Sequence, residues 1–339
     1  MNPASSSEPT PQRLMQFAFG YAPPLLIESG VKIGVFDFLD AAPAALEDIH
    51  NATGASLRGL RGLLNALVGI ELLAKEGDRY ALTAESAAFL VKGKPGFHGG
   101  FFQHTTTQLL PKWMQLETVV RTGKPATAVN QVGPGSEFFE MFVEGIFPMS
   151  YRAALAAAGH LQVGAASSPV SVLDLATGSG VWGVAFAQQS PQVRVTAVDW
   201  PGVLKVTRRI ADRFQLGDRF AYVEGDLHDA DFGRGHQVAT LGHILHSEGE
   251  AQSKSLLRKT FEALAPGGTI VIAEFVPNEE RTGPPMALTF AVNMLVNSEE
   301  GDTFTFGEIG SWLREAGFAD VRQLEAPAPS PLILATKPR

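Results

Sequence analysis

Three glycines and two aspartates form the pattern in this chain that points most directly to chemistry. Gly178, Gly180 and Gly183 spell G-x-G-x-x-G, a turn whose missing side chains let the backbone approach a nucleotide closely. Asp174 lies four residues before the first glycine, and Asp199 follows that glycine by 21 residues. The glycines alone are equally compatible with a dinucleotide site, another nucleotide site or an ordinary strand-to-helix turn.

The two aspartates argue against a dinucleotide site, because a carboxylate would repel the pyrophosphate of a dinucleotide. S-adenosylmethionine carries no phosphate, and its cationic amino group suits an acid such as Asp174. Asp199 is expected to end a second strand, where a carboxylate can accept hydrogen bonds from both ribose hydroxyls. Asp226 and Leu227 are expected to end a third strand and to contact the adenine amino group and ring face. The ordered set predicts S-adenosylmethionine as the cofactor, although each acid could instead cap a helix.

Apolar segments that alternate with helical stretches must carry these residues. From residue 170 onward this alternation predicts a mostly parallel, doubly wound, Rossmann-like α/β sheet, in which ligands bind beyond the carboxyl ends of the strands. We expect the last two strands to form an antiparallel edge pair. The expected strands are Val170–Leu175, Val193–Val198, Phe220–Val223, Val238–Leu241, Thr269–Phe275, Val321–Glu325 and Leu332–Ala335.

The region before the sheet has the pattern of a winged helix. A short helix over 46–50, a second helix over 57–67 and a hairpin over 72–82 are expected in that order. A DNA-binding module would be basic, but this segment contains four basic and five acidic residues and is therefore slightly acidic. These are Arg58, Arg61, Lys75 and Arg79 against Glu47, Asp48, Glu71, Glu76 and Asp78.

Composition and one linker complete the outline. A small-residue stretch over 164–169 predicts a helical domain over 12–163 and a cofactor-binding domain over 164–339. The net charge of -8 disfavours nucleic acid as a partner, and the absence of cysteine fits a reducing compartment. No export signal and no apolar run of about 18 residues is present, so we expect a cytoplasmic protein that acts on a small molecule.

With these segments in place, the sequence resembles the winged-helix, homodimeric small-molecule O-methyltransferases. These are the plant phenolic enzymes and their bacterial relatives that act on polyketides, phenazines, carotenoids and bacteriochlorophyll precursors. The family's glycine-rich loop matches 173–180, its Gly-Asp-Met-Phe segment matches 225–228, and its leucine-histidine base motif matches 245–246. The resemblance implies an N-terminal dimerisation domain and this cofactor set: Asp174, Gly178, Gly180, Asp199, Trp200, Asp226 and Leu227.

The chain departs from the family pattern at several positions near these motifs. Ser247-Glu248 stands where many members have Asp-Trp, and Gly242 replaces a lysine that packs near adenine in plant members. Two supporting acids of the family fall on Glu274 and on Asp302, the second of which is commonly glutamate. The resemblance also implies an acceptor pocket lined by Phe142, Ile146, Met149, Phe290, Asn293 and Met294.

Methyl transfer from a sulfonium is an in-line displacement that requires alignment and exclusion of water. His246 is interpreted as the general base that takes the proton of an acceptor hydroxyl, because imidazole titrates near neutrality. Glu274 or Asp302 could accept a hydrogen bond from its other ring nitrogen and select the tautomer. His243 lies three residues before His246, but no clustered ligand pattern accompanies the pair, so no metal is expected.

Other functions remain open from the sequence. The same fold and cofactor could serve C- or N-methylation or a non-methylating reaction. A winged-helix DNA-binding regulator and a nicotinamide-dependent dehydrogenase are the remaining alternatives. An apolar, aromatic pocket lining favours a planar, hydrophobic acceptor.

Overall fold

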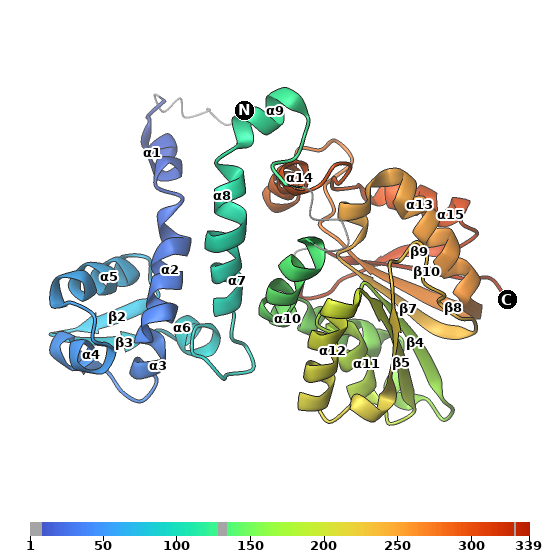
Figure 1. The fold of residues 1–339 in the computed structure, drawn as a ribbon, viewed down its shortest axis with the longest axis horizontal. Coiled ribbons are helices and arrows are strands. Elements are labelled where there is room, and N and C mark those ends of the chain that lie inside the picture. The colour runs from blue at the N-terminus through green and yellow to red at the C-terminus, as the bar shows by residue number, and fades with distance from the viewer. Residues whose placement is uncertain (1–8, 128–133, 329) are drawn as a thin grey trace, which may run out of the picture. The chain divides into compact units, whose positions relative to one another are not determined.

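A computed structural model describes residues 9–127, 134–328 and 330–339 (Figure 1), and these form two compact units that divide between Gln108 and Leu109. The boundary lies earlier than the linker expected at residue 164. The reason is that helix α10 (Pro134–His160) packs extensively on α11 (Val181–Gln189) and α12 (Pro201–Arg213), so it belongs with the sheet. Each unit is described separately below.

The N-terminal unit contains the expected winged helix. Helix α5 begins where the Ser56 hydroxyl accepts a hydrogen bond from the Gly59 amide, and its apolar stripe at Leu60, Leu64 and Leu67 is buried. The hairpin turns at glycine and pairs in a three-stranded sheet of order β1-β3-β2. The elements are α1 (Gln12–Ala18), α2 (Ala22–Ile33), α3 (Val35–Leu39), β1 (Ala44–Ala45), α4 (Leu46–Thr53), α5 (Leu57–Gly69), β2 (Leu73–Glu76), β3 (Arg79–Leu82), α6 (Ala84–Phe89) and α7 (Gly99–His104).

The second unit contains the expected doubly wound sheet. Its order is β6-β5-β4-β7-β8-β10-β9, with parallel pairing from β6 to β8 and antiparallel pairing of β10 with both β8 and β9. The predicted antiparallel edge pair is therefore confirmed. The strands are β4 (Val170–Leu175), β5 (Val193–Asp199), β6 (Phe220–Glu224), β7 (His236–Gly242), β8 (Leu264–Ala273), β9 (Ala319–Leu324) and β10 (Leu332–Thr336).

Both faces of this sheet are covered by helices, because successive strand residues point to opposite sides. Val172 packs into the core formed with α10, α11 and α12, whereas its neighbour Leu173 packs into the core formed with α13 (Leu245–Ala263) and α15 (Phe306–Glu315). The remaining helices are α8 (Leu110–Trp113), α9 (Leu116–Thr122) and α14 (Pro285–Asn297). None of the helices in the described part of the chain is both long and apolar enough to span a bilayer.

Strand β8 begins and ends slightly earlier than expected. It finishes at Ala273, so Glu274 and Phe275 lie just beyond its carboxyl end. The parallel neighbour β7 ends at Gly242, which pairs with Ala273. The residues that follow these two strands therefore emerge side by side at the edge of the sheet where ligands bind in such folds.

Candidate active site

Asp174 organises the glycine-rich turn from beneath. It is completely buried on β4, where one carboxylate oxygen accepts hydrogen bonds from the Thr177 hydroxyl (2.7 Å) and the Gly183 amide (2.9 Å). The other oxygen accepts from the Thr240 hydroxyl at 2.7 Å. Burial raises the pKa of Asp174 to about 6, and the three hydrogen bonds oppose that rise. The sequence predicted that Asp174 contacts the amino group of the ligand. The structure contradicts this prediction, because the Asp174 carboxylate is enclosed and its hydrogen bonds hold the turn.

The turn itself needs glycine at two positions. Gly178 and Gly180 have left-handed backbone angles, with φ of +54° and +76°. A Cβ atom on Gly180 would also lie 2.9 Å from the Thr207 methyl carbon. The predicted nucleotide turn therefore has the conformation that its glycines indicated.

Asp199, Trp200 and Asp226 converge at the carboxyl ends of β5 and β6. The Asp199 carboxylate accepts hydrogen bonds from the Gly178 amide (2.8 Å) and the Trp200 amide (2.7 Å), one on each oxygen. The Trp200 indole N–H donates to Asp226 at 3.3 Å, and the neighbouring Leu227 side chain is buried. Burial raises the pKa of Asp199 to about 7.

This arrangement fits the nucleoside part of S-adenosylmethionine. Each Asp199 oxygen accepts one protein hydrogen bond and retains a lone pair that can accept from a ribose hydroxyl. Within the described part of the chain, no lysine or arginine forms an ion pair with Asp199 or Asp226. A phosphate-free ligand suits such an anionic, hydroxyl-accepting edge better than a pyrophosphate.

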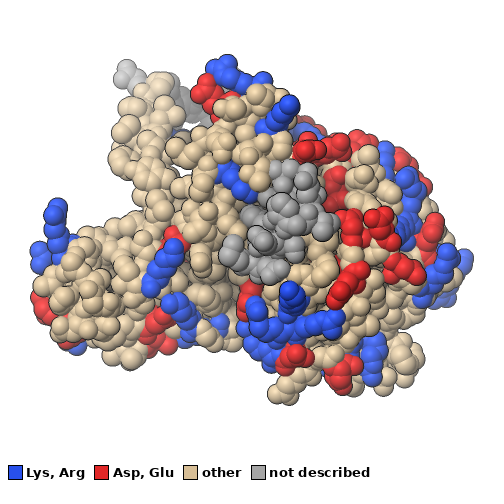
Figure 2. All heavy atoms as spheres, in the orientation of Figure 1, with Lys and Arg blue, Asp and Glu red and all other residues tan. Residues whose placement is uncertain are grey.

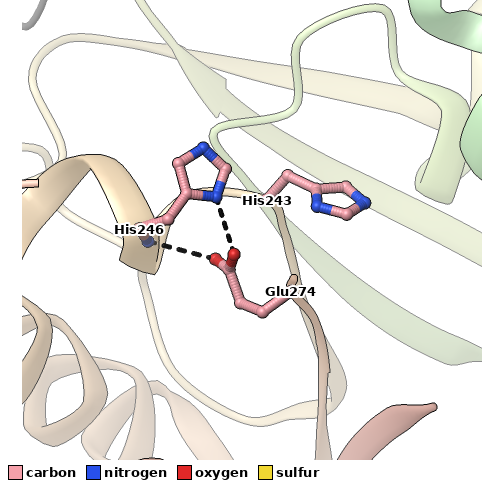
Figure 3. A group of neighbouring side chains, drawn as sticks. All are labelled: His243, His246 and Glu274. Carbon is pink, nitrogen blue, oxygen red and sulfur yellow. Dashed lines mark hydrogen bonds and ion pairs between the residues drawn. The ribbon is translucent and has the colours of Figure 1, made fainter. Parts of the chain in front are cut away.

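His246 and Glu274 form a close pair at the ends of the next two strands (Figure 3). The Nδ1 atom of His246 lies 2.6 Å from one carboxylate oxygen of Glu274, and the His246 amide donates to the other at 3.3 Å. Burial alone would raise the pKa of Glu274, but the charge and hydrogen bonds of His246 outweigh it and lower that pKa. Because an ionised carboxylate can only accept, the neutral imidazole that fits this contact carries its proton on Nδ1 and has an unprotonated Nε2.

Asp302 reaches His246 only through its backbone. Its amide donates to the His246 carbonyl oxygen at 2.9 Å. Its carboxylate instead accepts from the Thr303 amide at 2.7 Å and lies 4.0 Å from Arg281, with about half of the side chain exposed. The structure therefore contradicts the expectation that this carboxylate could orient the imidazole, and the acid that is hydrogen-bonded to the imidazole is Glu274.

His243 is a third member of this cluster that the sequence identified only by its spacing. Burial lowers the pKa of His243 to about 4, so its imidazole is neutral near pH 7, and its Nδ1 atom is enclosed without a hydrogen-bond partner. One ligand atom from each of His243, His246 and Glu274 lies within 4.8 Å of the others. Two imidazoles and a carboxylate are a donor set that transition metals accept. A hydrogen bond, however, already joins the His246 and Glu274 side chains.

Aromatic rings surround the candidate base. Phe290 on α14 meets His246 edge to face with ring centroids 4.9 Å apart, and it packs on Phe275 at 4.1 Å. Phe275 also packs on His243 at 5.0 Å. The sequence predicted Phe290 for the acceptor pocket but missed Phe275, whose only signal was its position directly after Glu274.

The other predicted pocket residues are distributed over two helices. On α14, the Asn293 side-chain oxygen accepts from the Trp113 indole N–H at 2.9 Å, and Met294 is buried. On α10, Phe142 packs against Phe139, which in turn packs on Trp200 of the cofactor segment. Ile146 is half-buried further along α10, and Met149 helps to line a small cavity that His243 and Glu274 share.

Gly242, one of the departures from the family pattern, has a steric explanation. A Cβ atom at this position would lie 2.1 Å from the indole nitrogen of Trp182, which belongs to the glycine-rich segment. The indole therefore occupies the space beside the end of β7. A lysine could not be accommodated there without displacement of Trp182.

Comparison with known proteins finds two family models that match this chain. Residues 113–319 match an O-methyltransferase domain, and residues 15–92 match an O-methyltransferase dimerisation domain. The chain is 29% identical over 336 residues to the tetracenomycin polyketide synthesis 8-O-methyl transferase of Streptomyces glaucescens, with 97% of each chain covered. It is 29% identical over 326 residues to a 3-hydroxy-5-methyl-1-naphthoate 3-O-methyltransferase of Streptomyces sahachiroi, with 94% of this chain and 92% of the relative covered.

A solved structure extends the likeness to the fold as a whole. Human N-acetylserotonin methyltransferase, crystallised in complex with S-adenosylmethionine, superimposes with a TM-score of 0.85. The match covers 98% of this chain and 99% of the human chain at 23% identity. The two-unit architecture is therefore shared across distant sequences.

Proposed function

Because this chain belongs to the O-methyltransferase family, we propose that His246 is the general base of its reaction and Glu274 the acid that orients it. The protein is an S-adenosylmethionine-dependent O-methyltransferase. When bound, S-adenosylmethionine supplies an electrophilic methyl group on a sulfonium. The chain must supply a nucleophilic oxygen, hold it in line and exclude water.

His246 supplies the nucleophile by taking a proton. A phenolic hydroxyl has a pKa near 10, so it is mostly protonated at neutral pH and benefits from a base. The Nε2 atom of His246 accepts that proton, and the buried Glu274 carboxylate stabilises the imidazolium that forms. Phe275 and Phe290 cover the imidazole with apolar rings and keep bulk water from competing for it.

The cofactor role is assigned to the ends of β4, β5 and β6. Asp199 accepts the ribose hydroxyls, and the turn at Gly178 and Gly180 brings backbone close to the nucleoside. Trp200, Asp226 and Leu227 contact the adenine end. Asp174 acts on the ligand only indirectly, because its carboxylate holds the turn from inside.

The acceptor is proposed to be a small aromatic compound with a hydroxyl group. The bacterial relatives are named for a polyketide and a naphthoate substrate. Phe275 and Phe290 place flat apolar faces beside the base, where a planar ring can pack. The pocket is assigned to α10 and α14, which carry Phe142, Ile146, Met149, Phe290, Asn293 and Met294.

The dimerisation domain indicates a homodimer, and we propose α1 and the start of α2 as part of its interface. Helix α1 buries none of its residues. Its segment exposes more than half of each large apolar side chain, and Figure 2 shows few charged side chains over it on the face in view. The exposed apolar residues are Leu14, Met15, Phe17, Phe19 and Tyr21. Exposed apolar area of this kind is expected to be covered in the assembled protein.

The observation that supports the proposal is the 2.6 Å contact between Nδ1 of His246 and a carboxylate oxygen of Glu274, beside the rings of Phe275 and Phe290. The test is a His246→Ala variant assayed for methyl incorporation into aromatic hydroxyl compounds, with the exposed His160→Ala variant as control. We expect kcat to fall by about 10³-fold in the first variant, within the usual range for a general base, and to stay unchanged in the second. Cofactor affinity by calorimetry should change less than about threefold. Full turnover by His246→Ala would contradict the base assignment and favour a nucleophile that needs no deprotonation.

A further inference from the structure

The turn that carries His246 is structurally separate from the helix that follows it. Gly249 has φ of 72° and ψ of 175°, which interrupts α13 between a first turn at 245–248 and the helix body beyond. A Cβ atom at Gly249 would lie 2.8 Å from both the Cβ and the carbonyl oxygen of Glu300. The backbone therefore changes direction between the turn and the helix body, and contacts from other residues help to hold the turn.

Hydrogen bonds from three neighbouring residues hold this turn. Glu274 accepts from both the ring and the amide of His246, and the Asp302 amide donates to the His246 carbonyl oxygen. The Ser253 hydroxyl reaches back from the helix body to the Leu245 carbonyl oxygen at 3.1 Å. None of these contacts joins the turn directly to the adenine segment at 225–228.

Glu248 provides that connection. Its carboxylate lies 2.8 Å from Nε2 of His228, the last residue of the adenine segment at 225–228. The Glu248 side chain is only 13% exposed, so loss of its partner would leave a poorly hydrated carboxylate. Burial raises the pKa of Glu248 and the charge of His228 opposes that rise, as expected for an acid that depends on its partner. Both residues stand at positions where the chain departs from the family's motifs.

His228 is in turn held firmly by its backbone. Its amide donates to Asp226 at 3.0 Å. The Lys259 ammonium, on the body of α13, donates to the carbonyl oxygens of Leu227 (2.8 Å) and His228 (2.9 Å). The adenine segment is thus fixed to the helix body, and the His228 imidazole adds a direct side-chain contact from that segment to the turn that carries His246.

We propose that His228 and Glu248 are positioning residues that couple the cofactor segment to the turn carrying the base. The proposal rests on the assignment of His246 as base. Nucleophile, methyl carbon and sulfur must be aligned, and a displacement of about 1 Å can cost about 100-fold in rate. The His228–Glu248 contact limits such displacement because it joins the residue at the adenine end to the turn two residues from the base.

The test is a double-mutant cycle with His228→Ala, Glu248→Ala and the double variant. We expect each single variant to lower kcat about tenfold while KM for the cofactor changes less than threefold. The double variant should be no slower than the slower single variant, since both remove one link. Glu250→Ala is the matched control, because Glu250 lies just beyond Gly249 and its ion pair with Lys254 stays within the helix body. A kcat within twofold of wild type in either single variant, or losses that multiply in the double variant, would overturn the proposal.

Amide hydrogen exchange of residues 244–249 gives a readout that does not depend on the base assignment. Exchange there should quicken at least threefold in His228→Ala and Glu248→Ala but not in Glu250→Ala, at an unchanged melting temperature. Unchanged exchange would show that the contact does not hold the turn. If His246→Ala retained turnover while exchange still quickened, the base assignment would fail and the link between the segments would stand.

Discussion

The buried acids of the cofactor site, Asp174 and Asp199, and the buried acid beside the base, Glu274, have pKa values that shift in opposite directions. At the ends of β4 and β5, Asp174 and Asp199 accept hydrogen bonds from backbone amides and hydroxyls, and burial raises their pKa values to about 6 and about 7. At the end of β8, Glu274 is also buried, but its pKa is lowered because a histidine lies against it. Burial favours the neutral form in all three cases, and of the three acids only Glu274 has a histidine against it that outweighs the effect of burial.

The kind of hydrogen-bond partner therefore distinguishes two roles of a buried carboxylate. Neutral donors suit acids that shape a turn and accept hydroxyl groups. A histidine partner suits an acid whose permanent charge stabilises an imidazolium during turnover. The comparison leads to four tests of which side of the site each group serves.

Glu274→Gln should produce the largest effect. The substitution keeps the shape but removes the charge, and its amide group can donate to Nδ1 and select the wrong imidazole tautomer. We expect kcat to fall about 100-fold with cofactor affinity unchanged within threefold, measured by steady-state kinetics and calorimetry. A loss confined to cofactor affinity would show that Glu274 serves cofactor binding and would contradict its proposed role beside His246.

Asp199→Asn should act on the cofactor side alone. An amide retains one acceptor oxygen but offers N–H donors toward the Gly178 or Trp200 amides, so both the turn and the ribose contacts weaken. We expect the dissociation constant for S-adenosylmethionine to rise about 30-fold, with kcat at saturating cofactor within threefold of wild type. Asp302→Asn, whose carboxylate is half-exposed, is the control and should change neither quantity more than twofold.

The pH dependence of cofactor affinity should report on Asp199. Its ionised form accepts the ribose hydroxyls, and its pKa in the free protein is raised to about 7 by burial. Below pH 7 binding must first remove a proton, so affinity is present above pH 7 and is lost as pH falls. Calorimetry should show about a tenfold weakening from pH 8 to pH 6, and the Asp199→Asn variant should show none of it.

Treatment with a chelator should have the smallest effect. The side chains of His243, His246 and Glu274 lie close enough to attract a transition metal, but a hydrogen bond already joins those of His246 and Glu274. We expect EDTA to change turnover less than twofold and added Zn²⁺ to inhibit by competing for the base. Recovery of activity on adding Zn²⁺ to EDTA-treated enzyme would contradict this expectation.

Much of the fold and part of the site could be predicted because they depend on features that are local in the chain. The alternation of apolar segments with helices predicted all seven strands, and the glycines at 178 and 180 predicted a turn with positive φ. His246 was predicted as the base from its position after the strand that is β7 in the structure, and the structure places its ring against Glu274. The same reasoning placed the domain boundary too late, because nothing in the sequence of α10 shows which neighbours it packs against.

The chain itself therefore determined where strands end and which reactive groups follow them, since covalent spacing and side-chain periodicity are properties of the sequence. Only the tertiary structure decided which way those groups face. It enclosed Asp174 instead of exposing it, turned the Asp302 carboxylate away from the base, and brought His228 against Glu248 across 20 residues of chain. These outcomes depend on packing between distant segments and on the loss of water around each charge, which no local pattern encodes.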